Sequence, residues 1–375
     1  MSISNFFHLF GKVGGDVENF FAPGRINIIG EHTDYNGGYV LPCPIKLGTQ
    51  VYIRRRTEDN LARLASSNYP GVFKISLDER VTPNPEHKWA NYPKGVIHMM
   101  QNDGHKIPGF DVMFTGNIPN GAGLSSSASI QMAMAMALNT MFKLNYSTLD
   151  LVKLVQQSEN KFIGVNCGIL DPFAIGMAKE DHAIYLHCDT LEHKYVPLNL
   201  EKNIIMVMDT NKRRALNESN YNERRSECDK ALAALISAGA PIKTLSDLTP
   251  DAFKPLAAKI ADETQRRRAT HVVNENHRVR QAVTVLEAGN AKILGMLLNA
   301  SHASLRDDYE VSCKELDTMV EEAQKNPACL GARMTGAGFG GCAIALVEKR
   351  KAEEFKHAVS TEYEKITGLA PNLFY

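Results

Sequence analysis

Apolar positions recur along the chain with two different periods. Short alternating or apolar runs are typical of strands, and longer stripes at three- and four-residue spacing are typical of helices. Strands are expected at residues 19–21, 25–29, 51–54, 110–114, 183–186, 203–208 and 342–347. Helices are expected at residues 125–142, 147–162, 221–238, 262–288, 291–303, 309–323 and 351–366. The second half of the chain is therefore expected to be mostly helical.

The length of 375 residues is that of about two domains. We place the boundary after Leu198, which gives a first domain of residues 1–198 and a second of residues 199–375. Lys and Arg together number 42, as do Asp and Glu, so the formal net charge is zero. This balance argues against nucleic acid or a membrane as a partner, and we expect a monomer.

The cysteines and the beginning of the sequence predict where the protein works. The seven cysteines are scattered and form no C-x-x-C pair, which favours reduced thiols over disulfides or zinc. The first residues lack a charged region followed by an apolar core, so no signal peptide is expected. Both features predict a cytoplasmic protein.

A glycine- and serine-rich stretch, residues 116–129, lies between a predicted strand and a predicted helix. Its glycines allow backbone N–H groups to converge, and the helix start adds unpaired donors and the positive end of a dipole. This arrangement suits an anion such as phosphate. The alternative is a serine-capped helix after a glycine turn, and the stretch alone does not decide. No charged residue lies between Val112 and Phe142, so any further charge must come from elsewhere.

A second polar segment, residues 30–38, lies between two apolar runs and contains Glu31, His32 and Asp34. Preceded by Arg25, these hydrogen-bonding side chains suit a polyhydroxylated ligand. The alternative is a solvated loop, but the glycines and the flanking apolar runs favour a binding site.

Other chemical signals are weaker. Gly336, Gly338 and Gly341 match G-x-G-x-x-G, but a predicted strand follows instead of a helix, so a dinucleotide site is excluded. No P-loop sequence G-x-x-x-x-G-K-[ST] is present, so a phosphate loop here is of another type. Asp171 precedes Pro172 and fits a helix N-cap, which alone explains an aspartate there. The single tryptophan, Trp89, is expected in the core or, as an alternative, stacked on a base.

Three segments resemble one family. Residues 119–128 are similar to the central motif of the GHMP small-molecule kinases, residues 24–36 resemble the signature of its galactokinase branch, and residues 333–341 resemble the third family motif. Residues 219–225 and 304–309 also fit, so the resemblance spans nearly the whole chain. It implies an α+β, two-domain GHMP kinase fold. The N-terminal domain would contain a left-handed βαβ unit, against the usual rule, and the C-terminal domain would be ferredoxin-like.

The resemblance also implies a reaction and its residues. ATP would phosphorylate the anomeric hydroxyl of galactose, the first committed step of galactose catabolism, with Mg²⁺ as cofactor. Asp171 would orient or deprotonate the hydroxyl, with Arg25 stabilising charge. The other implied contacts are Glu31, His32, Thr33, Asp34 and Tyr221 for the sugar; Gly121, Ala122, Gly123, Leu124, Ser125, Ser126 and Ser127 for the phosphates; Ser67 and Trp89 for the nucleoside; and Ser127 and Glu159 for the metal. Arg213 is a weaker candidate for phosphate charge.

The chain departs from the family pattern at Pro172, where glutamine is usual, at Leu170, where methionine is usual, and at Pro44, where alanine is usual. Pro172 removes a backbone donor and favours extended backbone at Asp171. Two alternatives to a galactose kinase stay open. One is a sugar- and ATP-binding sensor, against which the intact serine loop at residues 125–129 argues. The other is a kinase for an amino sugar or mevalonate, against which residues 31–34 argue.

Overall fold

The computed structural model describes residues 3–12, 14–213 and 218–375, with the side chains of Glu218 and Ser219 excluded. Ser219, the first residue of the family-like segment 219–225, therefore lies outside the described side chains. The chain forms two compact units that are discontinuous in sequence. Unit 1 comprises Met1–Arg25, Pro44–Pro119 and Ser125–Ala178, and unit 2 comprises Ile26–Cys43, Asn120–Leu124 and Lys179–Tyr375. The predicted domain boundary after Leu198 remains a prediction.

Unit 1 is built on a mixed five-stranded sheet with the order β1-β3-β6-β4-β5. The strands are β1 (Glu18–Asn27), β3 (Pro42–Arg55), β4 (Leu61–Ser66), β5 (Val72–Ser76) and β6 (Phe110–Gly116). Strand β6 pairs antiparallel with β3 and parallel with β4. A parallel pair needs a crossover, which here contains β5 and α2 (Asn91–Asn102).

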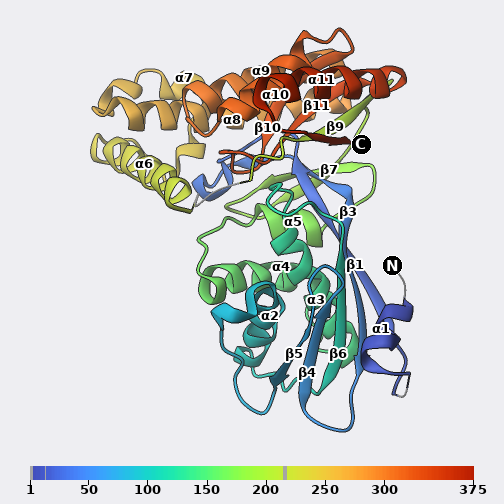
Figure 1. The fold of residues 1–375 in the computed structure, drawn as a ribbon. Coiled ribbons are helices and arrows are strands. Elements are labelled where there is room, and N and C mark those ends of the chain that lie inside the picture. Colours follow the sequence, from blue (N-terminus) through green and yellow to red (C-terminus); the bar gives the residue numbers. More distant parts are fainter. Residues whose placement is uncertain (1–2, 13, 214–217) are drawn as a thin grey trace. The chain divides into compact units, whose positions relative to one another are not determined.

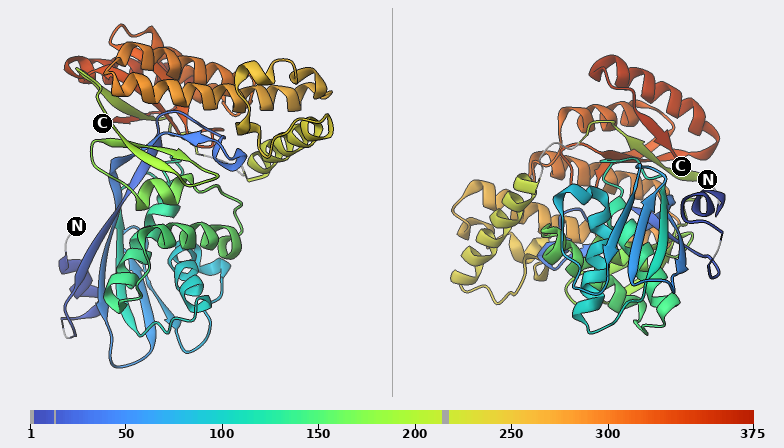
Figure 2. Two further views of the ribbon diagram at one scale, coloured as in Figure 1. Left: turned by 180° about the vertical axis from the view of Figure 1, so that it is seen from behind. Right: turned by 60° about the horizontal axis from the view of Figure 1, so that its bottom comes forward.

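Helices cover both faces of this sheet (Figures 1 and 2). On one face lie α2, α3 (Ser126–Phe142), α4 (Thr148–Gln157) and α5 (Leu170–Gly176). On the other lies α1 (Ile3–Phe10), whose Phe6 and Phe10 pack with Ala65 of β4 and Met113 of β6. Because both faces are covered, Phe110, Val112, Met113 and Phe114 are all buried, and so is the charged Asp111 between the first two.

Unit 2 contains a four-stranded antiparallel sheet with the order β10-β11-β9-β12. Its strands are β9 (Asn203–Asp209), β10 (Cys329–Thr335), β11 (Cys342–Glu348) and β12 (Asn372–Phe374). Helices separate β9 from β10 and β11 from β12, which gives the β-α-β-β-α-β sequence of a ferredoxin-like fold. The predicted ferredoxin-like topology is therefore confirmed.

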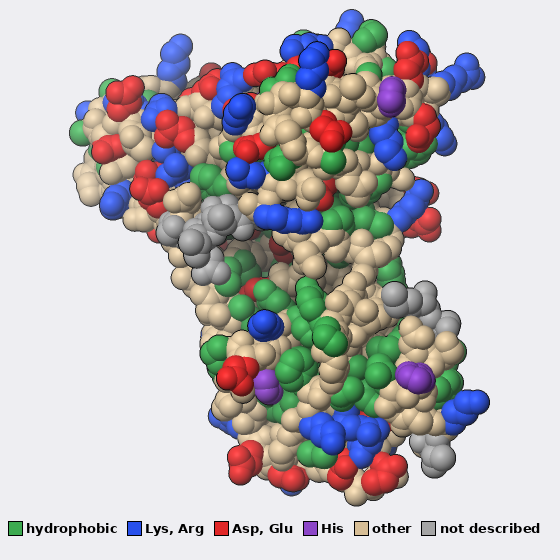
Figure 3. All heavy atoms as spheres, viewed as in Figure 1, with side chains coloured by type: hydrophobic (Ala, Val, Ile, Leu, Met, Phe, Trp, Pro, Cys, Tyr) green, Lys and Arg blue, Asp and Glu red, His purple; other side chains and the backbone are tan. Residues whose placement is uncertain are grey.

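The helices of unit 2 are α6 (Glu218–Ser237), α7 (Pro250–Phe253), α8 (Glu263–Glu287), α9 (Ala291–Asp307), α10 (Lys314–Lys325) and α11 (Ala352–Thr367). Figure 1 shows α10 and α11 lying along the four-stranded sheet. A smaller sheet contains β2 (Tyr39–Val40), β7 (His182–His187) and β8 (His193–Pro197). Acidic and basic side chains are intermixed on the face drawn in Figure 3.

Two sequence-based expectations about local structure were wrong. The helix expected from Tyr309 begins only at Lys314, because residues 309–313 make tertiary contacts in a non-helical conformation. Asp171 is not an N-cap and is not extended: α5 begins at Leu170 with Ile169 as its N-cap, so Asp171 lies in the first turn. Pro172 follows in the same turn, where a backbone N–H would lack an intrahelical partner, so its missing donor costs little.

None of the seven cysteines, all of which lie in described parts of the chain, forms a disulfide. Over the ranges that the structure describes, no helix combines the length and the apolar character needed to cross a bilayer.

A buried ion cluster joins α1 to the sheet. Asp111 on β6 is fully buried and accepts hydrogen bonds from Arg54, Arg56 and Arg63. Arg54 also donates to the carbonyl oxygens of Phe10 and Gly11, at the C-terminal end of α1. Burial alone would raise the pKa of Asp111, but the arginines hold it below its ordinary value.

We predict that Asp111→Asn destabilises the fold by about 3–5 kcal/mol, because it leaves buried arginines without their carboxylate. Since the pKa of Asp111 is lowered in the folded state, its contribution is present above the unfolded pKa and disappears as the pH falls through the folded value. Denaturant titration at pH 7 measures the loss. Asp59→Asn, which removes an exposed partner of Arg56, is the control and should cost little; equal losses in the two variants would contradict the prediction.

Candidate active site

Within unit 1, Arg25 on β1 and Asp171 on α5 form an ion pair. The guanidinium Nε and Nη2 atoms lie 2.7 Å and 2.6 Å from Asp171 Oδ1. Arg25 is buried, whereas a third of the Asp171 side chain is exposed. The pair therefore presents a carboxylate that one guanidinium orients through a single oxygen.

A second carboxylate, Glu159, lies where α4 continues as a π-helical turn, Ser158–Ile163. Gln131 Nε2 donates to Glu159 Oε1 at 2.8 Å, and the Ser127 side chain also hydrogen-bonds to this carboxylate. The pKa of Glu159 is raised to about 7, mainly by burial and also by the charge of nearby Asp171, although the hydrogen bonds from Ser127 and Gln131 work in the opposite direction. Glu159, Ser127 and Asp171 thus share one neighbourhood of unit 1.

Gln131, which holds Glu159 in place, was not predicted from the sequence. Its amide nitrogen bridges the Ser127 carbonyl and Glu159, and its amide oxygen accepts from Ser158 Oγ at 2.6 Å. Gly95 on α2 makes room for this arrangement, since a Cβ there would lie 2.2 Å from Ser158 Oγ. The available signal was an amide side chain one helical turn after Ser127, just before the apolar run 132–138.

The oxygens of Ser127 and Glu159 fit Mg²⁺, which is commonly held by one or two carboxylates together with substrate phosphates. A buried carboxylate with a raised pKa is also stabilised by a cation. Across the described residues, no cluster of three or more His, Cys, Asp or Glu side chains could hold a metal by itself. A metal at Ser127 and Glu159 would therefore take its remaining ligands from water or phosphate.

The glycine-rich loop has the backbone of an anion cradle. Gly121, Gly123 and Ser125 have positive φ angles of 74°, 74° and 63°. Ser125 is the N-cap residue of α3, but its side chain makes no capping hydrogen bond. Its buried Oγ has no hydrogen-bond partner among the described residues. The serine-cap alternative is therefore wrong for Ser125, and the geometry favours donors left for an anion.

Trp89 and Ser67 both contact one aromatic residue in unit 1, Phe114. The Trp89 ring is 5.7 Å from that of Phe114, and the Ser67 amide donates to the Phe114 carbonyl at 2.9 Å. Trp89 is only half-buried and lies parallel to Tyr69 at 6.3 Å. Trp89 is thus not a core residue, and the structure brings the two predicted nucleoside contacts together.

The signature segment in unit 2 is not a solvated loop, because Glu31, His32 and Thr33 are all buried. Glu31 Oε1 accepts from Thr335 Oγ1 and the Gly336 amide, and Oε2 accepts from Asn27 Nδ2 and pairs with Arg333. Burial raises the pKa of Glu31, against the lowering effect of Arg333. All four contacts hold the carboxylate within the protein.

The Thr33 hydroxyl is directed at the carbonyl oxygens of Gly30 and Tyr39, at 2.9 Å and 2.8 Å. Its side chain therefore supports the loop. Asp34 opens a short 3₁₀ helix, Asp34–Asn36, and is partly exposed. Of the acidic residues predicted to bind sugar, Asp34 is the more accessible.

The structure places Tyr221 of α6 against the same segment. Its ring centroid lies 5.6 Å from that of His32 and 5.2 Å from that of Tyr35. The His32 ring also lies 4.8 Å from that of Tyr309. Residues far apart in the sequence thus form one aromatic cluster around the signature segment.

Glu275 of α8 is a further buried carboxylate, one not predicted from the sequence. Its Oε1 accepts from the Gly30 amide at 2.9 Å and from Ser301 Oγ at 2.6 Å, and Arg278 donates to Oε2. Burial would raise its pKa, but Arg278 and neighbouring cations lower it to about 2. The signal was a charged residue on the helix face that carries Val272 and Val279. Arg213, in the same unit, donates to the Asn120 carbonyl, next to the glycine-rich loop.

Comparisons with known proteins identify the family. Three family models match: the galactokinase galactose-binding signature over residues 4–55, the GHMP kinases N terminal domain over residues 91–179, and the GHMP kinases C terminal over residues 282–365. A galactokinase of Clostridium tetani is 50% identical over 98% of this chain and 93% of its own length, and one of Bacillus subtilis is 47% identical over 98% and 95%.

Solved structures agree with this assignment. The galactokinase of Lactococcus lactis, solved in complex with galactose, superposes with a TM-score of 0.95 at 48% identity, covering 99% of this chain and 95% of its own. The mevalonate kinase of Methanococcus jannaschii, at 19% identity and a TM-score of 0.66 over 96% and 98%, shares the fold. The two-unit α+β fold and its motifs are those of the GHMP kinases. Within that family, the chain belongs to the galactokinases, which phosphorylate galactose with ATP.

We predict that Glu159→Gln stabilises the fold at pH 8 but not at pH 5. The pKa of Glu159 rises from 4.5 to about 7 on folding, so the parent loses stability as the pH rises from the unfolded value through the folded one. The gain should be on the order of 3 kcal/mol at pH 8, at 1.36 kcal/mol per pKa unit. Denaturant titrations at both pH values measure it, with the exposed Glu58→Gln as control. A gain that did not depend on pH would contradict the prediction.

Proposed function

We propose that this chain transfers the γ-phosphoryl group of ATP to the anomeric hydroxyl of galactose, the first committed step of galactose catabolism, in the cytoplasm. The observation that carries the proposal is the ion pair between Arg25 and Asp171, with its partly exposed carboxylate. Phosphoryl transfer needs positioning and charge stabilisation more than covalent help from the protein. The Asp171 carboxylate would position the hydroxyl, and the Arg25 guanidinium would stabilise the charge.

In this mechanism, Asp171 accepts a hydrogen bond from the anomeric hydroxyl and takes its proton. The hydroxyl oxygen bonds to the γ-phosphorus of ATP as the bond from that phosphorus to the bridging oxygen breaks and ADP leaves. Arg25 fixes the direction of the carboxylate through Oδ1. Its charge also stabilises the negative charge on the transferring phosphoryl group.

The remaining contacts follow the geometry of each segment. The positive-φ residues Gly121, Gly123 and Ser125 favour a backbone cradle for the triphosphate, formed by residues 121–127. Mg²⁺ would be held by Ser127 and Glu159, and it would neutralise phosphate charge when bound. The half-buried Trp89 and Ser67, which both contact Phe114, would contact the nucleoside. Arg213 is a candidate for additional phosphate charge.

We propose that Asp34 and Tyr221 contact the sugar directly. Asp34 is partly exposed, and Tyr221 of α6 packs against His32 of the signature segment. Glu31 could bind a sugar hydroxyl only by exchanging one of its four present partners. Thr33 would act through the loop, because its hydroxyl is directed at two backbone carbonyls.

We predict that Asp171→Asn keeps galactose and ATP binding but lowers turnover by about 10²–10⁴-fold, the usual contribution of a general base. The amide preserves the shape but cannot take the proton. A coupled assay of ADP release measures turnover, and calorimetry measures binding. Asp181→Asn, the same change in an exposed turn, should leave both unchanged. Turnover within a few-fold of the parent would remove the base role from Asp171.

The same ADP-release assay tests the substrate. Galactose should be used well, and N-acetylgalactosamine, glucose and mevalonate poorly. Efficient use of mevalonate or of an amino sugar, without galactose, would overturn the proposed function. Binding of galactose and ATP without turnover would indicate a sensor.

We predict that Asp34→Ala weakens the use of galactose strongly and narrows the preference for galactose over glucose. The C3 and C4 hydroxyls of galactose can both donate to one carboxylate, and such charge-assisted bonds are stronger than neutral ones. An epimer leaves that carboxylate poorly paired. The kcat/KM values for both sugars measure the preference. Glu31→Ala is the contrasting variant: it should lower stability, because Arg333 loses its buried partner, and leave the C4 preference largely intact. If Asp34→Ala kept the parent's preference for galactose over glucose, Asp34 would not recognise the C4 hydroxyl.

A further inference from the structure

A chain of four side chains runs through the aromatic cluster of unit 2. His32 Nδ1 lies 2.8 Å from the Tyr35 hydroxyl, which lies 2.8 Å from the Tyr309 hydroxyl. The Tyr309 hydroxyl in turn lies 3.1 Å from Cys228 Sγ on α6. The other nitrogen of His32, Nε2, lies 3.1 Å from the Ala337 carbonyl oxygen.

The Ala337 carbonyl determines the direction of every hydrogen bond in this chain. A carbonyl oxygen only accepts, so His32 Nε2 must carry the proton. The ring is 5% exposed and packs against tyrosine rings, and burial favours its neutral form. In a neutral ring, Nδ1 then accepts from Tyr35. Because the Tyr35 hydroxyl donates its only proton to His32, it must accept the hydrogen bond from Tyr309. The Tyr309 hydroxyl then has no further proton to donate, so the Cys228 thiol donates to it.

The far end of the chain suits this direction. Cys228 is fully buried, and burial raises the pKa of its thiol to about 12, so the thiol keeps its proton at neutral pH. Burial also raises the pKa of Tyr35 and of Tyr309 well above the ordinary value. Each hydroxyl therefore remains a donor to the next member of the chain.

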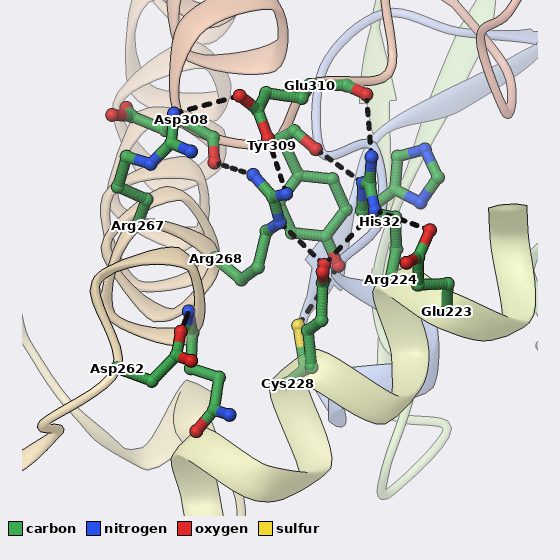
Figure 4. A network of polar contacts seen from close by, with 12 residues as sticks. His32, Glu223, Arg224, Cys228, Asp262, Arg267, Arg268, Asp308, Tyr309 and Glu310 are labelled. Carbon is green, nitrogen blue, oxygen red and sulfur yellow. Dashed lines mark hydrogen bonds and ion pairs between the residues drawn. The ribbon is translucent and has the colours of Figure 1, made fainter.

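The same contacts fasten helix α6. Cys228 lies two helical turns after Tyr221, on the same side of the helix. Arg224, between them, donates to the carbonyl oxygens of Tyr309 and Glu310. Figure 4 shows Arg224 and Cys228 directed from α6 toward Tyr309, with His32 nearby. Buried Arg268 of α8 adds bonds to Glu310 and to the Asp308 carbonyl, which hold the 308–310 segment in place.

We propose that His32 is a positioning residue, locked as the Nε2–H tautomer by a one-way hydrogen-bond chain from Cys228 through Tyr309 and Tyr35. Both ring nitrogens of His32 form hydrogen bonds within the protein, so the ring is held in one orientation. Tyr221 packs against the ring in that orientation. The sugar role of Tyr221 rests on the proposed function; the tautomer and the direction of the chain do not. Through the contact between His32 and Tyr221, Cys228 and Tyr309 also support the sugar site.

The tautomer is tested first, in the sugar-free protein. Protein labelled with ¹⁵N-histidine gives separate signals for the nitrogens of the twelve histidines, and His32→Gln identifies those of His32. We expect a protonated Nε2 and an unprotonated, hydrogen-bonded Nδ1. Cys228→Ala should move the Nδ1 signal, and Cys228→Ser, which restores a donor, should return it toward the parent position. A doubly protonated ring, or an Nδ1–H tautomer, would reverse the chain and overturn the proposal.

Kinetics test the consequence for the sugar. Tyr309→Phe and Cys228→Ala should raise the galactose KM roughly three- to tenfold, the worth of one hydrogen bond, with the ATP KM unchanged and Cys228→Ser close to the parent. Tyr363→Phe is the matched control, because it removes a buried hydroxyl that donates to the Thr210 carbonyl in the same unit, outside the chain. An equal rise in the control, or no rise in either chain variant, would overturn the positioning role. Failure of the proposed function differs: the parent itself would not phosphorylate galactose.

Discussion

The buried carboxylate of Glu31 imposes the constraint on which much of unit 2 depends. A charge that is 3% exposed is tolerated only if every oxygen is paired. Asn27, Thr335, Gly336 and Arg333 supply the four partners, and they come from β1, from β10 and from the turn after β10. The two family motifs at opposite ends of the chain are therefore mutually dependent. Glu275 of α8 is a second buried and fully paired carboxylate. It accepts hydrogen bonds from the Gly30 amide, Arg278 and Ser301.

Glu159 in unit 1 illustrates the opposite case. It is almost as buried as Glu31, but its partners are an amide and a hydroxyl. Glu31 and Glu275, in contrast, each have a guanidinium. The difference supports the proposal that Glu159 is left for a ligand, whereas Glu31 and Glu275 complete the fold. Asp111, surrounded by three arginines, belongs to the first group.

The sequence predicted best what depends on local pattern. Helices 221–238, 262–288 and 351–366, and strands 110–114 and 342–347, agree with the structure to within a few residues, since apolar period and glycine punctuation act locally. The position of Asp171 was predicted less well: N-cap chemistry fitted, but packing starts α5 at Leu170. Gln131 and Glu275 were missed because their partners, Glu159 and Gly30, are distant in sequence. The motif resemblance assigned the same sugar-binding role to Glu31, His32, Thr33 and Asp34. Only the structure shows which of their polar atoms already form hydrogen bonds within the protein.

The partners of Glu31 also bear on how the protein folds during synthesis. Thr335 and Gly336 follow Glu31 by 304 and 305 residues, and β12, at residues 372–374, is the edge strand paired with β9. A ribosome that has made only residues 1–209 has therefore produced Glu31 with one of its four partners, Asn27, and strand β9 without its neighbours β11 and β12. Unit 2 cannot close until the chain is nearly complete, and such long-range pairing folds slowly. Residues 26–43, although among the first translated, are thus among the last to reach their native contacts, and a premature stop codon near the 3′ end of the message would leave them exposed to proteases and chaperones.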